Sequence, residues 1–313
     1  MTAPGFPTSR LLGQLPAVKG GYTENAPLDK VTWFRAGGPA EVMFRPADEG
    51  DLITFMESKP VNIPLTVIGI GSNLLIRDGG VPGVVVRLGR EFAEVQILPG
   101  GEMRTGAGAL NLGVAMAARD AGIAGMEFLS SIPGTVGGSL RMNAGAFGVE
   151  MKDIVTTARA LDDGGGVHDL TLADLGFAYR SCGVPQKWIF LSVLLRGRGG
   201  KIADISRRLT EIKNERRVSQ PQRVSTGGST FTNPAGGKKA WELIDKAGCR
   251  GLRRGDAMVS EKHCNFLINA GNATAADLEG LGEEVRQRVA AATGVDLEWE
   301  IHRIGVAAGE GKS

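Results

Sequence analysis

The sequence predicts an α+β protein in which short strands, joined by glycine turns, mix with helices. Runs rich in Val, Ile, Leu and aromatic residues recur between turns, as in residues 63–69, 81–89 and 188–197. Longer stretches, such as residues 274–293, instead place apolar side chains at helical spacing. The 47 glycines follow no collagen period, so they indicate tight turns and close approach of the backbone to a ligand.

The first third of the chain reads as a small α+β unit. VTWFRAGG and PAEVMFRPA, together residues 31–47, are two strand-like runs around a Gly-Gly turn, which predicts a hairpin. Residues 48–59 read as a helix that ends where a proline follows. The strands at 63–69 and 81–89 complete a first domain, for which we expect residues 1–89.

The middle of the chain predicts a second domain, residues 90–215. Two hairpins are expected, one at 92–109 over Pro-Gly-Gly and one at 156–172 over three glycines. A helix is expected between them at 111–122. Residues 201–217 predict a further helix, with an apolar stripe on one face and Lys and Arg largely on the other.

Residues 216–299 predict a third domain with a helix at 240–248 and a strand at 265–270. A second helix should begin after Thr274, which can cap it while the Asp277 carboxylate returns a hydrogen bond.

The ordered chain is expected to end in an alternating strand, LEWEIHRIG at 297–305. Its pattern puts Glu300 on the face opposite the apolar residues. We expect the C-terminal strand, within residues 300–313, to return to the first domain.

Composition excludes several classes of protein. Thirty-six basic residues against 34 acidic ones give a net charge of +2, which does not suit a dedicated nucleic-acid binder. The first residues lack the apolar core of a signal peptide, and no stretch approaches the length of a membrane-spanning helix. The three cysteines form no C-x-x-C motif, so neither a metal site nor a disulfide framework is indicated. We expect a cytoplasmic monomer with reduced thiols, no metal, and no nucleic-acid or membrane partner.

Two glycine-rich segments predict binding of an anionic ligand. GIGSNL, residues 69–74, begins like a dinucleotide fingerprint, but Leu74 replaces the third glycine and no long helix follows. A Rossmann site is therefore disfavoured. Residues 130–139 gather Ser, Thr and Gly, so that many backbone N–H groups can converge on a pyrophosphate. A purely structural loop is the alternative interpretation.

A third glycine turn, GGSTFTNP at residues 227–234, points to Ser229 as a reactive group. Two adjacent glycines allow a ligand to approach the backbone without a Cβ in the way. His168, His263 and His302 all lie outside any G-x-S-x-G nucleophile elbow, so an acid role for the hydroxyl is the hypothesis to test. A tight turn that caps a helix is the structural alternative.

Six motifs, in one order and at about the same spacing, resemble the UDP-N-acetylenolpyruvoylglucosamine reductase family of peptidoglycan synthesis. The resemblance extends from about Pro27 to Gly305. It implies a two-domain FAD-binding fold of the vanillyl-alcohol-oxidase (PCMH) type, followed by a third α+β domain that binds the substrate. The motifs are VTWFRAGGPAEV, GIGSNLLIRDGG, LSSIPGTVGGSLRMNAGAFG, FAYRSC, GGSTFTNP and LEWEIHRIG.

The resemblance also implies a reaction and a set of residues. The family reduces the enolpyruvyl ether on UDP-N-acetylglucosamine to UDP-N-acetylmuramate, with NADPH and FAD. Arg180, Ser229 and Glu300 resemble its catalytic set. Only 48 residues separate Arg180 from Ser229, which resembles the shorter branch of the family, without a substrate-clamping Tyr loop. Neither FAD-like segment contains a His for a covalent link, so the FAD is expected to be non-covalent.

The resemblance assigns further residues to the two ligands. Arg217 resembles the family's contact to the UDP diphosphate, and Arg216 is close by. The implied FAD contacts are Gly69, Gly71, Ser72, Asn73, Leu74, Ser131, Pro133, Gly134, Gly137, Gly138, Asn143 and Ala144. The implied substrate contacts are Lys213, Arg217, Asn233 and Lys262.

These residue types suit the implied chemistry. Reduction of an enol ether requires stabilisation of negative charge beside the substrate carboxylate, which Arg180 and Glu300 can supply. Ser229 would then protonate the adjacent carbon. Two alternatives stay open. An FAD-dependent alcohol oxidase of the same fold would use O₂ instead of NADPH, and a non-catalytic nucleotide-binding module would purify without colour.

Overall fold

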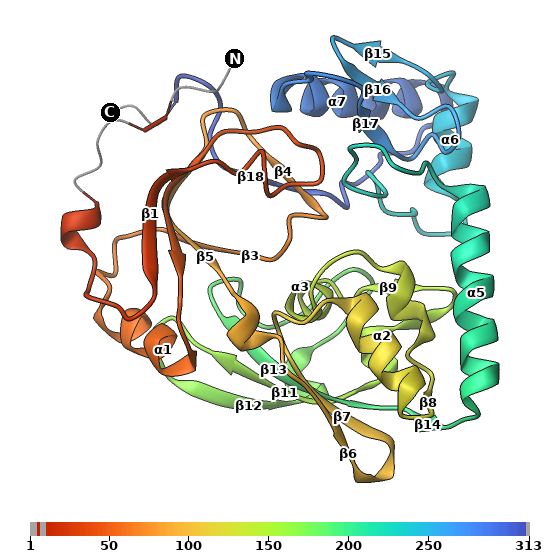
Figure 1. Ribbon diagram of the computed structural model, residues 1–313. Helices are drawn as coiled ribbons and strands as arrows, with labels where there is room; N and C mark the ends of the chain where they lie inside the picture. Colours follow the sequence, from red (N-terminus) through yellow and green to blue (C-terminus); the bar gives the residue numbers. More distant parts are fainter. Residues whose placement is uncertain (1–4, 7–10, 311–313) are drawn as a thin grey trace.

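The structure, a computed structural model, describes residues 5–6 and 11–310 (Figure 1). A four-stranded sheet with the order β1-β2-β5-β3 forms the first part of the chain. Its central strand β5 is buried on both faces, and Val84, Val85 and Val86 are each 0% exposed. The helix predicted at 48–59 is confirmed as α1. The bounds are β1 Gly21–Ala26, β2 Ala40–Arg45, α1 Glu49–Ser58, β3 Leu65–Ile68, β4 Leu74–Ile76 and β5 Val81–Arg87.

The hairpin predicted at residues 31–47 is wrong in its first strand. β2 pairs with β1, antiparallel, whereas residues 31–39 contain no strand. Gly37 has a φ of +112°, and a Cβ there would lie 2.3 Å from the carbonyl oxygen of Ile76. The Gly-Gly pair therefore allows the chain to pack closely against β4 and does not form a hairpin turn.

A five-stranded antiparallel sheet, with the order β12-β11-β13-β7-β6, lies at the bottom of Figure 1. Both predicted hairpins are confirmed, as β6–β7 and β11–β12. Helices α2 and α3 pack on this sheet around Val114, Leu140 and Val193. The bounds are β6 Val95–Leu98, β7 Glu102–Gly106, α2 Asn111–Asp120, β8 Ile123–Ala124, α3 Val136–Arg141, β9 Gly145–Ala146, β10 Val149–Glu150, β11 Val155–Leu161, β12 Val167–Thr171, α4 Leu172–Leu175, β13 Ile189–Arg196 and β14 Arg198–Gly199.

The long helix α5 connects this sheet to the C-terminal elements, drawn in blue (Figure 1). There, α7 packs on α6 and the small sheet β15-β16-β17 around Leu278, Leu281 and Ile244. The predicted capping box at the start of α7 is present, because Thr274 Oγ1 accepts a hydrogen bond from Asp277 N at 3.0 Å. The bounds are α5 Ile202–Ser219, α6 Ala240–Lys246, β15 Arg253–Arg254, β16 Ala257–Val259, β17 Leu267–Asn269, α7 Ala275–Thr293 and β18 His302–Ile304.

The C-terminal segment returns to the first part of the chain. β18 pairs with β4 in parallel register, His302 opposite Leu74. The strand is shorter than predicted, because residues 297–301 make only one isolated bridge, from Trp299 to Phe231. Residues 311–313, the last part of the range expected to return to the first domain, lie outside the described residues. The three-domain division stays a prediction.

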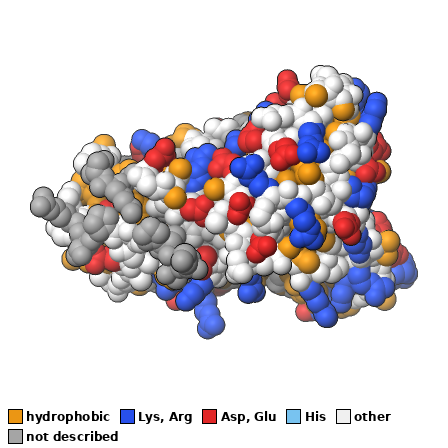
Figure 2. Space-filling view, turned by 90° about the horizontal axis from the view of Figure 1, so that it is seen from above, with side chains coloured by type: hydrophobic (Ala, Val, Ile, Leu, Met, Phe, Trp, Pro, Cys, Tyr) orange, Lys and Arg blue, Asp and Glu red, His pale blue; other side chains and the backbone are white. Residues whose placement is uncertain are grey.

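Helix hydropathy and surface charge bear on what the molecule contacts. Within residues 11–310, no helix is long and apolar enough to cross a membrane. On the face shown in Figure 2, Lys and Arg side chains lie among Asp and Glu side chains, in keeping with the nearly balanced charge of the sequence.

Candidate active site

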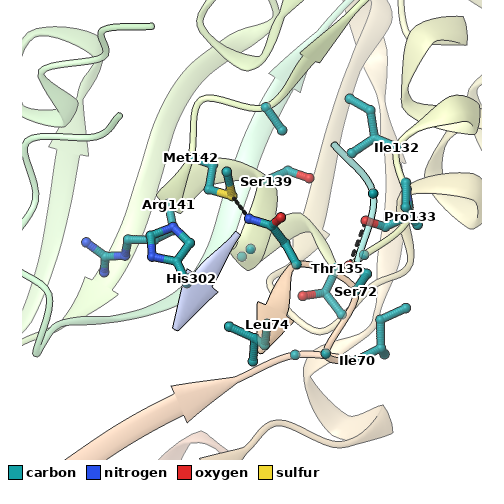
Figure 3. Close-up of a pocket in the computed structure, with 18 of the residues that line it drawn as sticks. Ile70, Ser72, Leu74, Ile132, Pro133, Thr135, Ser139, Arg141, Met142 and His302 are labelled. Atoms are coloured by element: carbon teal, nitrogen blue, oxygen red, sulfur yellow. Dashed lines mark hydrogen bonds between the residues drawn. The ribbon is translucent and has the colours of Figure 1, made fainter. Parts of the chain in front are cut away.

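A cavity of about 480 Å³ is lined by segments from all parts of the chain. Residues 69–74 and the segment around α3 contribute much of its wall, and His302 of β18 lies beside them (Figure 3). Arg180, Ser229 and Glu300 also line it, so the structure brings together the three residues that the sequence singled out. The other predicted residues in its wall are Gly69, Gly71, Ser72, Asn73, Leu74, Ser131, Pro133, Gly134, Gly137, Gly138 and Ala144.

The two glycine-rich loops are fastened to each other. Ser72 Oγ donates a hydrogen bond to the Pro133 carbonyl oxygen at 2.9 Å (Figure 3). Gly69 is equally close to the second loop, because a Cβ on it would lie 2.7 Å from Thr135 Oγ1. A side chain at position 69 would therefore push the loops apart.

Ser229 and Glu300 lie on neighbouring segments. The Glu300 N–H donates to the carbonyl oxygen of Thr230 at 2.8 Å, and the Asn73 amide donates to the carbonyl oxygen of Glu300 at 3.0 Å. Gly228 has a φ of +87°, and a Cβ there would meet no atom within 4 Å, so the turn is open beside Ser229. Among the described residues, the Ser229 hydroxyl has no hydrogen-bond partner and is available to a ligand.

Arg180 and Glu300 form an ion pair inside the cavity. Arg180 Nε donates to Glu300 Oε1 at 3.0 Å, and Nη2 donates to the Gly145 carbonyl oxygen at 3.1 Å. The two side chains are 20% and 17% exposed. Arg180 also has a φ of +54°, a left-handed backbone state that is strained for an arginine. Strain of this kind persists where the surrounding structure enforces it, and it clusters at functional sites.

The Glu300 carboxyl has a perturbed affinity for protons. Burial raises its pKa above the ordinary glutamate value, and the opposing effect of the Arg180 guanidinium does not cancel that rise. Glu300 therefore keeps a proton at higher pH than an exposed glutamate does. A carboxyl in this state can share a proton with a ligand as well as orient the arginine beside it.

Arg141, at the end of α3, fixes another wall of the cavity. Its Nη1 donates to the Val184 carbonyl oxygen at 2.5 Å and its Nη2 to that of Trp188 at 2.7 Å. The guanidinium also lies 4.9 Å from the centre of the Phe190 ring. Figure 3 shows Arg141 beside His302. Burial, and secondarily the Arg141 charge, lower the pKa of His302, which favours its neutral ring.

Five of the predicted contacts lie outside the cavity lining. The Asn143 amide is buried and donates to the Ala178 carbonyl oxygen at 3.0 Å. Lys262 Nζ donates to the carbonyl oxygen of Arg217 at 2.6 Å, at the end of α5. Their ligand roles stay predictions, as do those of the whole group: Asn143, Lys213, Arg217, Asn233 and Lys262.

Arg216 reaches the cavity where Arg217 does not. Its Nη1 donates to the carbonyl oxygen of Ser131, and its Nε donates to Gln220 Oε1 at 2.7 Å. Burial lowers its pKa, and within the described part of the chain no carboxylate pairs with it. Such a cation is suited to a ligand anion.

Several lining residues were not singled out from the sequence. The clearest are Arg141, Trp188, Gln220, Phe266 and His302. Arg141 and His302 do lie within two of the six motifs, so their motif context was a usable signal. Trp188, Gln220 and Phe266 carry no such signal, because only the folded chain brings them to the cavity.

Comparisons with known proteins match the chain to one family of reductases. A profile for the C-terminal domain of UDP-N-acetylenolpyruvoylglucosamine reductase matches residues 220–304, and a profile for an FAD binding domain matches residues 40–171. The UDP-N-acetylenolpyruvoylglucosamine reductase of Paramagnetospirillum magneticum is 59% identical over 93% of this chain and 94% of its own. That of Parvibaculum lavamentivorans is 56% identical over 96% of each chain.

A solved structure gives the same result. The crystal structure of UDP-N-acetylenolpyruvylglucosamine reductase from Thermus caldophilus has a TM-score of 0.79 and 34% identity, and the match covers 92% of this chain and 100% of that one. These matches confirm the resemblance read from the six motifs, the α+β fold with an FAD-binding part, and FAD as a cofactor. The alternative of a non-catalytic binding module is not supported, since the named relatives are reductases.

Proposed function

The chain belongs to the UDP-N-acetylenolpyruvoylglucosamine reductase family of oxidoreductases, and we propose that it reduces the enolpyruvyl ether of its UDP-N-acetylglucosamine substrate to UDP-N-acetylmuramate with NADPH. The proposal rests on one observation above all. Arg180, Ser229 and Glu300 line the same cavity as the two glycine-rich loops. The reaction would supply a precursor of peptidoglycan.

The cavity residues fit FAD. The loops at 69–74 and 131–138 offer backbone groups and small side chains, as a pyrophosphate requires. Arg216 adds a half-buried cation without a carboxylate partner among the described residues. Trp188 and Phe190 supply aromatic surface in the same wall. We assign these residues to FAD, held without a covalent bond.

Bound FAD supplies hydride transfer between NADPH and the substrate. The protein must then stabilise the negative charge that develops beside the substrate carboxylate. Arg180 is oriented for this task by Glu300 and by the Gly145 carbonyl, which engage its Nε and Nη2 atoms. Within the described residues its Nη1 remains for a carboxylate, and Glu300, whose pKa is raised by burial, can share a proton with the same group.

Ser229 completes the reduction in this proposal. Its hydroxyl would give a proton to the carbon next to the one that receives the hydride, and the resulting alkoxide would regain a proton from solvent. A hydroxyl is a weak acid, so the step requires a strongly basic intermediate and a site that excludes water. The half-buried position of Ser229 in the cavity is consistent with that requirement.

Separate measurement of the two half-reactions distinguishes the acid role of Ser229 from a general loss of activity. Ser229→Ala should leave reduction of the flavin by NADPH unchanged in a stopped-flow experiment, but slow its reoxidation by the substrate. Thr232→Ala, which removes a hydroxyl from the same turn outside the cavity, should change neither rate. Equal loss of both half-reactions in Ser229→Ala would reject the acid role. Rapid reoxidation by O₂ and an alcohol product, with no response to NADPH, would favour the oxidase alternative.

The unpaired cysteines support a reducing, cytoplasmic compartment. Cys182, Cys249 and Cys264 are buried and unpaired. Burial raises the pKa of all three thiols, so they are poorly reactive. We propose a cytoplasmic protein on this basis, and the monomeric state stays a prediction.

A further inference from the structure

A second recess lies outside the cavity in which the reaction is proposed to take place. It has a volume of about 820 Å³ and is formed by the turn at residues 29–35 and by residues 223–225, which lead into the Ser229 turn. None of its lining residues lines the catalytic cavity. It is therefore a separate feature of the surface.

The recess carries an excess of positive charge. Lys30, Arg35 and Arg223 line it together with a single carboxylate, Asp29. All three cations are exposed, and across the described residues none of them forms an ion pair. Cations left unpaired in a concave wall attract anions. The planar fork of an arginine matches phosphate oxygens in particular.

The two arginines are held in unusual backbone states. Arg35 has a φ of +53° and Arg223 a φ of +56°. Left-handed backbone costs about 1 kcal/mol or more for a residue that is not Gly or Asn. Of the described non-glycine residues, the one other arginine in this state is Arg180 of the catalytic cavity. Backbone strain at two arginines that line one recess indicates that the direction of their side chains is functionally important.

An aromatic side chain lies among these cations. Trp33 is 39% exposed although its neighbour Phe34 is fully buried. A partly exposed indole face is a platform on which a nucleic-acid base can stack. Arginine forks for phosphate and an indole for a base are together the two elements of a nucleotide site.

We propose that this recess binds a nucleotide, with Arg35 and Arg223 on its phosphate and Trp33 against its base. The site is argued from the recess alone, and only the assignment of its ligand to NADPH rests on the proposed function. A backbone hydrogen bond joins the recess to the wall of the catalytic cavity, because the Trp33 N–H donates to the carbonyl oxygen of Gly71 at 3.1 Å. Two sources share this chemistry: the adenosine phosphate part of a dinucleotide such as NADPH, and a uridine nucleotide.

Calorimetric titration of the FAD-loaded enzyme tests the proposal with three probes: adenosine 2′,5′-bisphosphate, UMP and inorganic pyrophosphate. The double variant Arg35→Gln/Arg223→Gln should bind the preferred nucleotide at least about tenfold more weakly, since each charge-assisted contact is worth that much or more. The control Lys238→Gln/Lys246→Gln removes two exposed charges elsewhere and should bind as the parent does. Equal affinity for every probe in the two variants would overturn the proposal, because binding would then lie elsewhere, for instance in the catalytic cavity.

The probes also identify the source and test the base. Tighter binding of the adenosine probe than of UMP supports the dinucleotide, and the reverse order supports a uridine nucleotide. Trp33→Phe should abolish nucleotide-dependent quenching of tryptophan fluorescence while the protein stays folded by circular dichroism. Pyrophosphate binding as tight as that of either nucleotide, with no quenching in the parent enzyme, would overturn the assignment to a nucleotide.

Discussion

The Arg180–Glu300 pair allows stability and chemistry to be separated by two substitutions at one position. Glu300→Ala leaves Arg180 in a largely buried place without its carboxylate. Glu300→Gln keeps an oxygen that can accept the Nε hydrogen bond, which is 3.0 Å long in the parent structure. The two variants differ in structure but are alike in one respect. Neither has a carboxyl that can exchange a proton with the substrate, as Glu300, with a pKa raised by burial, can.

The expected magnitudes follow from the burial of the pair. Loss of one partner of a buried ion pair costs about 3–5 kcal/mol, and with side chains 20% and 17% exposed we expect the lower end, about 3 kcal/mol, for Glu300→Ala. Glu300→Gln loses the attraction between charges but also the cost of burying a carboxylate. We expect its free energy of unfolding to lie within about 1 kcal/mol of the parent value. Both variants should slow substrate reduction on the order of 10²-fold or more.

Urea unfolding and stopped-flow flavin reoxidation measure these two quantities independently. If Glu300→Gln reoxidises with substrate at the parent rate, the proton-sharing role of Glu300 is refuted. If the loss of rate follows the loss of stability across the two variants, Glu300 has only a structural role. Reduction by NADPH, which does not involve this carboxyl in our proposal, serves as the internal control.

Three further predictions concern other parts of the structure. Gly71→Ala should lower the free energy of unfolding by about 2 kcal/mol or more, because its Cβ would lie 2.8 Å from Thr32 Cα at a φ of +66°. The control Gly100→Ala has a φ of +76° but open space around its Cβ, so it should lower the free energy of unfolding by only about 1 kcal/mol. Equal losses of the two variants in urea unfolding would contradict the packing argument. Arg141→Met should raise the FAD dissociation constant about tenfold or more, since three backbone carbonyl bonds are lost, and an unchanged constant, measured from released flavin fluorescence, would argue against its role in the wall. Burial lowers the pKa of His263 in the folded protein, so the stability it contributes is present above about pH 6.5 and is lost as the pH falls; urea unfolding should show a smaller decrease on acidification in His263→Gln, and the same decrease would refute this.

Local features of the fold were predictable from the sequence, whereas the partner of each strand within a sheet was largely not. The capping box of Thr274 and Asp277 and the glycine hairpins follow from rules that act within a few residues. The hairpin at residues 31–47 failed because β2 takes its partner from residues 21–26, and no local pattern states which strands pair. The two glycines that suggested a turn serve instead a close contact with β4.

The same division holds for the site. Motif context led to Arg180, Ser229 and Glu300, and the structure places all three on one cavity. It assigned Arg217 to the UDP diphosphate, which stays a prediction, and it did not single out Arg216 as a residue of the cavity wall. Successive residues of a helix point about 100° apart, so neighbouring arginines on α5 face different surroundings. The axial orientation of α5 is set by packing that a linear sequence does not display.

Anaerobic spectroscopy of the purified protein tests the central claim most directly. We predict a yellow protein whose flavin absorbance is bleached by NADPH and restored, in the absence of O₂, by the enolpyruvyl ether of UDP-N-acetylglucosamine. A colourless protein able to bind no FAD, or a bleached flavin that this substrate leaves reduced, would contradict the function proposed for the cavity around Arg180, Ser229 and Glu300.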